Sequence, residues 1–489
     1  MSESAPFTPF DQFLASLGGA DALGELRRGL IGKDKTVPGP YGPKPLLYCD
    51  YTASGRALWQ VERFVMEEVL PWYANSHTEA SYCGARMTQM RRAARKVVAQ
   101  ACGAGSEHAV IFCGAGATAG INRLVHLFGV SAAMARGERP LVLIGPYEHH
   151  SNILPWRESG AEVCILPEAT EGGPCRDALD AALAEAKAEG RLIIGAFSAA
   201  SNVTGLRTDV AGVTRRLRAA GAKVVWDYAA GGPYLPIDMT PEPGAEIDAI
   251  VTSPHKFAGG PASSGVLVVR KDAVVTDRPS WPGGGTVKFV SPGGHDYASS
   301  LEAREEAGTP NVVGDIRTAL AFLVKTAAGL DRIASRGAEL RDRAVAAFRT
   351  EPRIEILGKP GRDSLPILSF RVRGAQGEVV HHQFITRLLS DLHGVQVRGG
   401  CACAGPYVHD LLGIDAAESA RMRQAILAGR ETDKPGFVRM NLSYLMSDDE
   451  AQTAIDAVLD VAHRAPDLLA QYEVDPASAI FRPKGSLAA

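Results

Sequence analysis

Short apolar runs alternate with helical segments between about residues 109 and 270, and this alternation restricts the fold more than any other feature. Most of these runs are bounded by glycine or by turn residues. They are Ala109–Phe112, Pro140–Gly145, Ala161–Leu166, Leu192–Phe197, Lys223–Trp226, Ala249–Thr252 and Gly265–Arg270. Near-continuous hydrophobicity is typical of strands buried on both faces. The pattern therefore predicts an α/β fold with a mostly parallel, seven-stranded sheet covered by helices.

Beyond about residue 312 the pattern becomes that of a smaller α+β domain. The expected elements are a long helix over 314–350 with a break near Gly329, strands near 354–357, 365–372 and 395–398, and helices over 378–391 and 448–464. Residues 413–435 resemble a charged helical insertion, and about the last fifteen residues resemble a tail. The expected divisions are an N-terminal segment 1–44, a large domain 45–311 and a small C-terminal domain 312–489 with N-terminal contributions.

Composition argues against several classes of partner. The 489 residues include 52 basic and 55 acidic side chains, so a net charge of −3 gives no reason to expect nucleic acid or anionic membrane as a ligand. No run approaches the roughly 18 apolar residues of a membrane span, and residues 1–6 lack the features of a signal peptide. Eight scattered cysteines do not resemble a disulfide framework. We therefore expect a cytoplasmic protein.

One segment combines a lysine with groups that suit a phosphate. Residues Thr252–Ala262 read Thr-Ser-Pro-His-Lys-Phe-Ala-Gly-Gly-Pro-Ala and lie between two expected strands. Lysine forms a Schiff base with aldehyde cofactors. The hydroxyl of Ser253 and the glycine N–H groups are donors that a phosphate needs. The alternative is an exposed loop lysine beside a histidine with no chemical role.

A glycine-rich turn between an expected strand and helix is a second phosphate candidate. Residues 112–120 read Phe-Cys-Gly-Ala-Gly-Ala-Thr-Ala-Gly. The first-turn N–H groups of a helix are unpaired and lie at the positive end of its dipole, so anions bind there. A dinucleotide-binding turn is the competing interpretation. However, the spacing Gly114-x-Gly116-x-x-x-Gly120 does not match G-x-G-x-x-G.

These two segments resemble the lysine and phosphate turns of the class V aminotransferase and cysteine desulfurase family, and the resemblance extends over about residues 45–465. It implies the fold type I architecture with pyridoxal 5′-phosphate (PLP) as cofactor. In this family the cofactor aldehyde is bound by the residue that matches Lys256. Further cofactor contacts implied by the resemblance are Ala117, Thr118, Ser253 and His255.

Four more segments match the family in the same order. His149 resembles the histidine that stacks on the pyridine ring and transfers protons, although a histidine pair is also typical of a surface turn. Asn202 resembles the asparagine that hydrogen-bonds the phenolic oxygen of the ring. Asp227 ends a buried strand, where a carboxylate is costly unless paired, and a protonated pyridine nitrogen is the partner that the family implies. Thr309 resembles a residue that reaches the neighbouring subunit's cofactor, which implies a homodimer with shared sites.

The chain departs from the family three residues after Asp227. The family usually has a glutamine there that contacts the phenolic oxygen, whereas this chain has Ala230. Alanine has no side-chain hydrogen-bonding group, so that contact must come from Tyr228, Asn202 or water.

The C-terminal part carries the residues expected to select the reaction. Arg398 opens a glycine-rich loop, and Cys403 follows five residues later, as in sulfur-mobilising cysteine desulfurases. A thiolate there would take sulfur from PLP-bound cysteine. The Cys401-x-Cys403 pair also resembles the loop of molybdenum cofactor sulfurases. One alternative is that the two cysteines are small residues packed in a loop. The other is a zinc site, but Cys-x-Cys without a second cysteine pair nearby is poor spacing for zinc.

Arg439 lies in an apolar run and resembles the family arginine that binds the substrate α-carboxylate. Its planar guanidinium can donate two parallel hydrogen bonds to a carboxylate. The alternative is a solvated residue at the edge of a sheet. Together with Arg398, it forms the expected substrate-binding pair.

The resemblance implies a PLP-dependent enzyme that converts L-cysteine to L-alanine and an enzyme persulfide. It implies a small amino-acid substrate and a sulfur-acceptor protein as partner, without a metal. Other activities in the family are those of selenocysteine lyases, aminotransferases, C–S lyases and epimerases, and a molybdenum cofactor sulfurase-like transfer is a further alternative. A non-enzymatic scaffold would have lost Lys256 or Asp227, and both are present.

Overall fold

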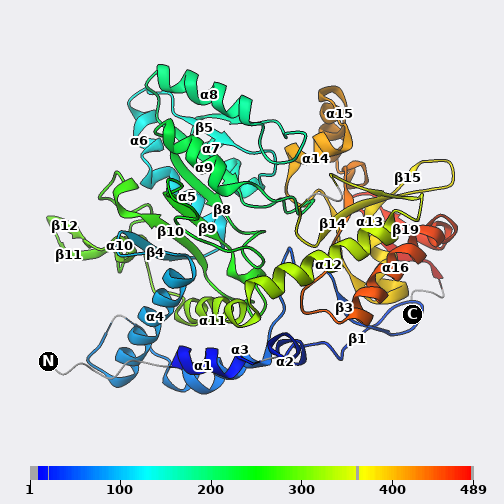
Figure 1. The fold of residues 1–489 in the computed structure, drawn as a ribbon, viewed down its shortest axis with the longest axis horizontal. Coiled ribbons are helices and arrows are strands. Elements are labelled where there is room, and N and C mark those ends of the chain that lie inside the picture. Colours follow the sequence, from blue (N-terminus) through cyan, green and yellow to red (C-terminus); the bar gives the residue numbers. More distant parts are fainter. Residues whose placement is uncertain (1–8, 20, 77, 360–362, 486–489) are drawn as a thin grey trace. The chain divides into compact units, whose positions relative to one another are not determined.

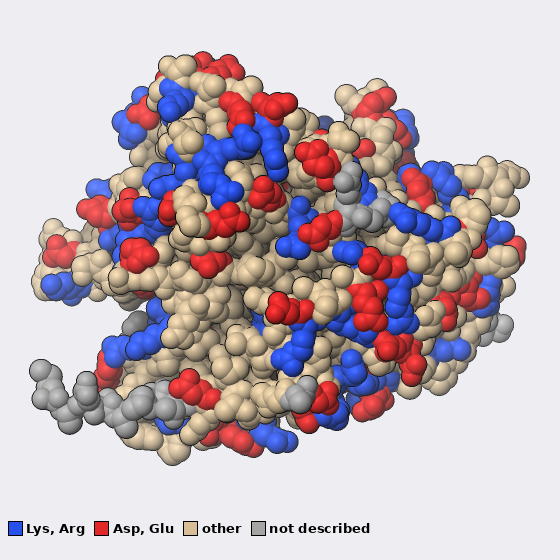
Figure 2. Space-filling model, viewed as in Figure 1, with Lys and Arg blue, Asp and Glu red and all other residues tan. Residues whose placement is uncertain are grey.

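The computed structural model describes residues 9–19, 21–76, 78–359 and 363–485 (Figure 1). The chain divides into two compact units. The first unit comprises Met1–Leu30, Ser54–Ala199 and Thr208–Arg332, and the second comprises Ile31–Ala53, Ala200–Arg207 and Ile333–Ala489. No helix among the described residues is long and apolar enough to cross a membrane. Basic and acidic side chains are interspersed over the face drawn in Figure 2.

A seven-stranded sheet forms the centre of the first unit. In chain order its strands are β4 (His108–Cys113), β5 (Leu141–Ile144), β6 (Glu162–Ile165), β7 (Ile193–Ser198), β8 (Lys223–Asp227), β9 (Ala249–Thr252) and β10 (Gly265–Arg270). The spatial order is β4-β10-β9-β8-β7-β5-β6. Only the pairings of β10 with β9 and β4 are antiparallel. All seven expected strands are therefore confirmed, as is the mostly parallel sheet.

Helices pack their apolar faces against this sheet. The helices that follow its strands include α5 (Ala117–Leu127), α6 (Val130–Ala135), α7 (Leu154–Glu158), α8 (Arg176–Ala188) and α9 (Val210–Ala219). In α5 the residues Ile121, Leu124 and Leu127 recur at helical spacing and are fully buried in one cluster with the strand residues. This apolar stripe fixes α5, and with it the turn at its N-terminus, on the sheet.

The expected long helix is divided at Gly329, as predicted. Helix α11 (Val312–Ala328) ends there because Gly329 has a φ of +79°, and α12 (Leu330–Phe348) begins at the next residue. Nearly every residue of α11 is buried, and the helix packs against α4 (Tyr82–Ala101) in the first unit. The smaller domain was expected to begin at residue 312, but α11 lies in the first unit. Its burial on nearly all sides is typical of a helix inside a large domain.

The second unit is built on a five-stranded antiparallel sheet. Its strands are β13 (Ile354–Ile356), β14 (Ile367–Arg373), β15 (Val379–Val380), β17 (Arg398–Gly400) and β18 (Phe437–Asn441). Helices α13 (His382–His393) and α16 (Asp448–Leu468) supply much of the apolar core beside this sheet. A separate parallel pair joins β3 (Leu47–Tyr48) to β16 (Val395–Gln396). The expected α+β organisation is thus present.

The expected insertion and tail both have regular structure. Helix α15 (Ala416–Leu427) lies within the expected insertion, and only one of its residues is buried, whereas α14 (Gly405–Leu412) directly precedes the insertion. The prediction of a tail over about the last fifteen residues is wrong as far as residue 483, since β19 (Tyr472–Asp475) and β20 (Ile480–Pro483) form a hairpin. Tyr472 and Phe481 are buried against Phe384, and this packing holds the hairpin in place.

Candidate active site

The Lys256 turn and the glycine-rich turn lie side by side in the first unit. Strands β4 and β9 both pair with β10 in antiparallel fashion, so they run parallel to each other and end at the same edge of the sheet. Gly116 has a φ of +65°, and a β-carbon there would lie 2.6 Å from Ser253 Oγ and 3.0 Å from His255 Cε1. Glycine is therefore required for the close approach of the two turns.

Hydrogen bonds connect the groups expected around a phosphate. The backbone N–H of Ala117 donates to Ser253 Oγ at 3.0 Å. On the next residue, Thr118 Oγ1 lies 2.7 Å from the hydroxyl oxygen of Ser151. Backbone donors at the start of α5 and three hydroxyl groups therefore gather at one end of the sheet. This donor set fits a phosphate monoester.

His149 is held in one orientation by Ser151. The backbone N–H of Ser151 donates to His149 Nδ1 at 3.1 Å, and Ser151 Oγ lies 2.9 Å from the same nitrogen. Because Nδ1 accepts the backbone hydrogen bond, the neutral imidazole carries its proton on Nε2. His149 is thus tied through Ser151 to Thr118, at the start of α5.

Asp227 ends β8 and is 3% exposed. Its Oδ1 accepts a hydrogen bond from Ala229 N at 2.7 Å. Burial raises the pKa of this carboxyl above its usual range, whereas the Ala229 N–H and the charge of Lys256 act to lower it. A buried carboxylate within electrostatic range of the lysine amine fits the protonated nitrogen of a pyridine ring.

Glu148 is a buried acid for which no role was expected from the sequence. It accepts hydrogen bonds from Asn152 Nδ2 at 2.6 Å, from Ser198 N at 2.8 Å and from Ser198 Oγ at 2.7 Å. Burial raises the pKa of this carboxyl to about 7, and Asp227 adds to the shift. Glu148 joins the His149 segment to the end of β7, beside β8. The sequence signal that could have indicated a role for Glu148 was its position directly before His149 and His150.

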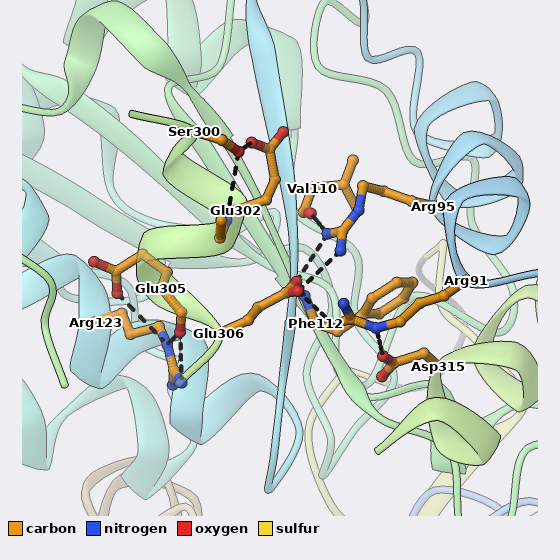
Figure 3. Close-up of polar contacts among 11 residues, drawn as sticks. Arg91, Arg95, Val110, Phe112, Arg123, Ser300, Glu302, Glu305, Glu306 and Asp315 are labelled. Carbon is orange, nitrogen blue, oxygen red and sulfur yellow. Dashed lines mark hydrogen bonds and ion pairs between the residues drawn. The ribbon is translucent and has the colours of Figure 1, made fainter. Parts of the chain in front are cut away.

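A buried ion-pair cluster holds the outer edge of β4 (Figure 3). Phe112 N donates to Glu306 Oε1 at 2.7 Å, and Arg95 donates to both oxygens of Glu306 at 2.8 and 2.9 Å. Arg91 contacts Glu306 and also donates to Asp315 at 2.6 Å. Although burial opposes ionisation, the two guanidinium groups hold the pKa of Glu306 below its usual range.

The same cluster fixes the segment that carries Thr309. Glu306 lies three residues before Thr309, and Gly308 N donates to Gly284 O at 2.7 Å. The Thr309 residue itself is exposed in the first unit. Glu306 thus anchors β4, the strand that leads into the glycine-rich turn. It also anchors the nearby Thr309, which is expected to act across a dimer.

In the second unit, Arg439 and Arg398 share one carboxylate. The two arginines lie opposite each other on β18 and β17. Asp50 Oδ1 accepts from Arg439 Nη2, and Asp50 Oδ2 accepts from Arg398 Nε, both at 3.0 Å. Arg439 is 4% exposed, so the alternative of a solvated edge residue is wrong. Burial lowers the pKa of Arg439, and Asp50 opposes that shift.

Asn202 and the cysteine loop also lie together in the second unit. The backbone oxygen of Asn202 accepts from Arg439 Nη1 at 3.1 Å, and its Nδ2 donates to Ala402 O at 2.7 Å. The Cys403 residue is exposed and Cys401 is partly buried. Asn202 therefore links the Arg439 guanidinium to Ala402, the residue directly before Cys403. Neither the contacts of Asp50 nor the hydrogen bond to Ala402 could be predicted from the sequence.

The donor set of the first unit therefore fits PLP: a lysine amine, hydroxyl and N–H groups for the phosphate, and a buried carboxylate for the ring nitrogen. Within the described part of the chain, no group of three or more His, Cys, Asp or Glu side chains could hold a metal ion.

The fold and these residues define a PLP-dependent enzyme of fold type I. A family model for aminotransferase class-V matches residues 47–469, and the chain belongs to this family. The cysteine desulfurase of Enterobacter sp. (strain 638) is 33% identical over 370 residues, which cover 74% of this chain and 85% of the relative. A probable cysteine desulfurase of Vibrio cholerae is 32% identical over 436 residues, or 87% and 95% of the two chains.

Solved structures show the same fold. The apo cysteine desulfurase of Thermococcus onnurineus has a TM-score of 0.72 at 22% identity, covering 90% of this chain and 98% of that chain. An Escherichia coli cysteine desulfurase has a TM-score of 0.68 at 24% identity, covering 91% and 98%. At these identities the likeness concerns the fold.

Proposed function

We propose that the protein is a cysteine desulfurase-like enzyme that converts L-cysteine to L-alanine and transfers the sulfur to Cys403. The observation that carries this proposal is the exposed Cys403 on the loop that Asn202 links to the buried Arg439. An amino acid bound through its carboxylate to this arginine would present its side chain near an accessible nucleophile. The relatives named cysteine desulfurase, which match most of the chain, support the same activity.

The residues of the first unit bind and orient the cofactor in this proposal. Ala117, Thr118, Ser253 and His255 hold its phosphate, His149 stacks on its ring, and Thr309 serves the partner's cofactor. Lys256 binds the aldehyde carbon and moves protons to and from the substrate. Asp227 keeps the ring nitrogen protonated. Bound PLP supplies an electron sink for the bond-breaking steps.

The residues of the second unit bind the substrate in this proposal. Arg439 and Arg398 carry two positive charges, and Asp50 neutralises one of them. One net positive charge is left for one substrate carboxylate. Asn202, whose backbone oxygen accepts from Arg439, holds that guanidinium in place. The Cys403 thiolate then attacks the substrate sulfur, and its proton passes to solvent beforehand.

A product analysis tests the proposal. Purified holoenzyme is incubated with L-cysteine, L-selenocysteine and common amino acids, and alanine, sulfide and keto acids are measured. Alanine formed from L-cysteine with sulfur bound to the protein is the expected result. Keto acid as the main product would favour an aminotransferase, and activity on selenocysteine alone would favour a selenocysteine lyase.

We further infer a homodimer in the cytoplasm that passes sulfur to an acceptor protein. Exposed apolar residues near the Thr309 segment, among them Trp281 (70% exposed) and Phe289 (59%), support association of two copies. All eight cysteines have free thiols, which supports a reducing compartment. Light scattering during gel filtration tests the dimer, and a monomeric holoenzyme would refute it.

A further inference from the structure

The cysteine loop forms a tight turn that carries both thiols, with Cys401 at its first position and Cys403 at its third. Ala404 N donates to Cys401 O at 3.2 Å, and the two central residues, Ala402 and Cys403, have φ values of +50° and +54°. An i→i+3 hydrogen bond with two positive φ angles defines a type I′ turn. Successive Cα atoms are 3.8 Å apart, so such a turn brings the Cα atoms of Cys401 and Cys403 to about 5.5 Å. Disulfides span this distance.

This turn contains residues that do not favour its backbone. Type I′ turns prefer asparagine or glycine at their centre, whereas this chain has alanine and cysteine. Two contacts from residues 201–205 hold the segment. Asn202 donates to the carbonyl oxygen of Ala402, and Thr204 Oγ1 lies 3.3 Å from Tyr407 Oη in the helix that follows the turn. Strain of this kind that is kept in place by neighbours indicates a functional site.

The chemistry of the pair follows from the reaction proposed for Cys403. A persulfide is attacked readily by a nearby thiolate, because an outer sulfur leaves as hydrosulfide. Cys401 is partly exposed and lies on the same turn, so it needs no large rearrangement to reach Cys403. The other six cysteines lie elsewhere in the sequence, at positions 49, 83, 102, 113, 164 and 175.

We propose that Cys401 is a resolving thiol that releases the sulfur from Cys403 as hydrosulfide. This inference rests on the proposed function, which supplies the persulfide. The Cys401 thiolate, having lost its proton to solvent, attacks the inner sulfur on Cys403. The bond to the outer sulfur breaks, and that sulfur leaves as HS⁻ with the electron pair. A Cys401–Cys403 disulfide remains, and an external thiol reductant returns it to the dithiol.

The test uses one turnover without oxygen. Holoenzyme receives one equivalent of L-cysteine per subunit, is quenched with acid, and is analysed for alanine, sulfide and intact mass. Wild-type protein is expected to lose the mass of two hydrogen atoms and to release one sulfide per alanine. The Cys401→Ser variant is expected to gain the mass of one sulfur atom and to release at least tenfold less sulfide per alanine. Dithiothreitol restores the wild-type mass.

Controls separate this inference from the proposed function. Cys175→Ser, at another partly exposed cysteine, is expected to behave like the wild type. Cys401→Ala repeats the test with a side chain that cannot hydrogen-bond. If wild type and Cys401→Ser form alanine and keep the extra sulfur equally, Cys401 is not a resolving thiol, although the desulfurase activity stands. If neither forms alanine from L-cysteine, both proposals are wrong.

Discussion

The side-chain amide of Asn202 donates to the carbonyl oxygen of Ala402 at 2.7 Å. The family resemblance assigns this amide to the phenolic oxygen of the cofactor, and its second N–H remains for that contact. Asn202 therefore holds the turn that carries both loop cysteines. Its backbone oxygen also accepts from Arg439. A change at Asn202 is consequently expected to affect both the loop and the orientation of Arg439.

The first prediction concerns Lys256. Lys256→Ala should abolish covalent attachment of PLP after borohydride reduction, because the variant has no amine at the aldehyde carbon. Intact mass spectrometry checks this. Lys271→Ala, at an exposed lysine after β10, is the matched control and should keep the attachment. A reduced adduct that persists in Lys256→Ala would show that another amine binds the cofactor.

Asp227→Asn should lower turnover by at least a hundredfold while PLP stays bound. Asparagine keeps an acceptor for Ala229 N but loses the charge that holds the ring nitrogen protonated. Asp248 is an equally buried aspartate that instead accepts from Val224 N and pairs with Arg218. Asp248→Asn should therefore affect stability more than turnover. Near-normal turnover in Asp227→Asn would assign the nitrogen to another group.

Arg439→Lys should raise the KM for L-cysteine by at least tenfold, since loss of a charge-assisted hydrogen-bonding fork costs about 1.5–3 kcal/mol. The fall in kcat should be smaller. Arg371, on the neighbouring β14, pairs with Glu355 and provides the control substitution Arg371→Lys. An unchanged KM in Arg439→Lys would mean that the substrate carboxylate binds elsewhere.

Glu148 should make stability fall as pH rises from about 4.5 to about 7. The folded protein holds the Glu148 proton up to about pH 7, whereas an ordinary glutamate loses it near 4.5. The unfolded state therefore binds fewer protons in this window, and the free energy of unfolding decreases by at most about 3 kcal/mol. Glu148→Gln should remove this slope. Thermal melting of both proteins from pH 4 to 8.5 measures the difference, and parallel curves would contradict it.

The sheet could be predicted because its seven strands are short, continuous apolar runs whose burial depends on local composition. The break between α11 and α12 could also be predicted locally, from Gly329 itself. The roles of Asp50 and Glu306 could not be predicted, because their arginine partners come from segments distant in the sequence. The hairpin at 472–483 depends on packing against Phe384, which is likewise a long-range contact.

The turn at Cys401–Ala404 could not be predicted from its residues. Alanine and cysteine rarely adopt positive φ, so the segment carries no turn signal of its own. Its contacts come from Asn202, which donates to Ala402 O, and from Thr204, which lies beside Tyr407 in the following helix; both are about two hundred positions earlier in the chain.

The most direct test of the central claim is alanine formation by Cys403→Ala. Wild-type holoenzyme and the variant each receive L-cysteine, and alanine is measured by mass spectrometry over one turnover. The variant keeps Lys256 and Arg439, so it should still bind L-cysteine, seen as a change in the cofactor absorbance. It should nevertheless form at least a hundredfold less alanine than the wild type, since no thiolate removes the sulfur. Alanine formed by Cys403→Ala at the wild-type rate would contradict the account.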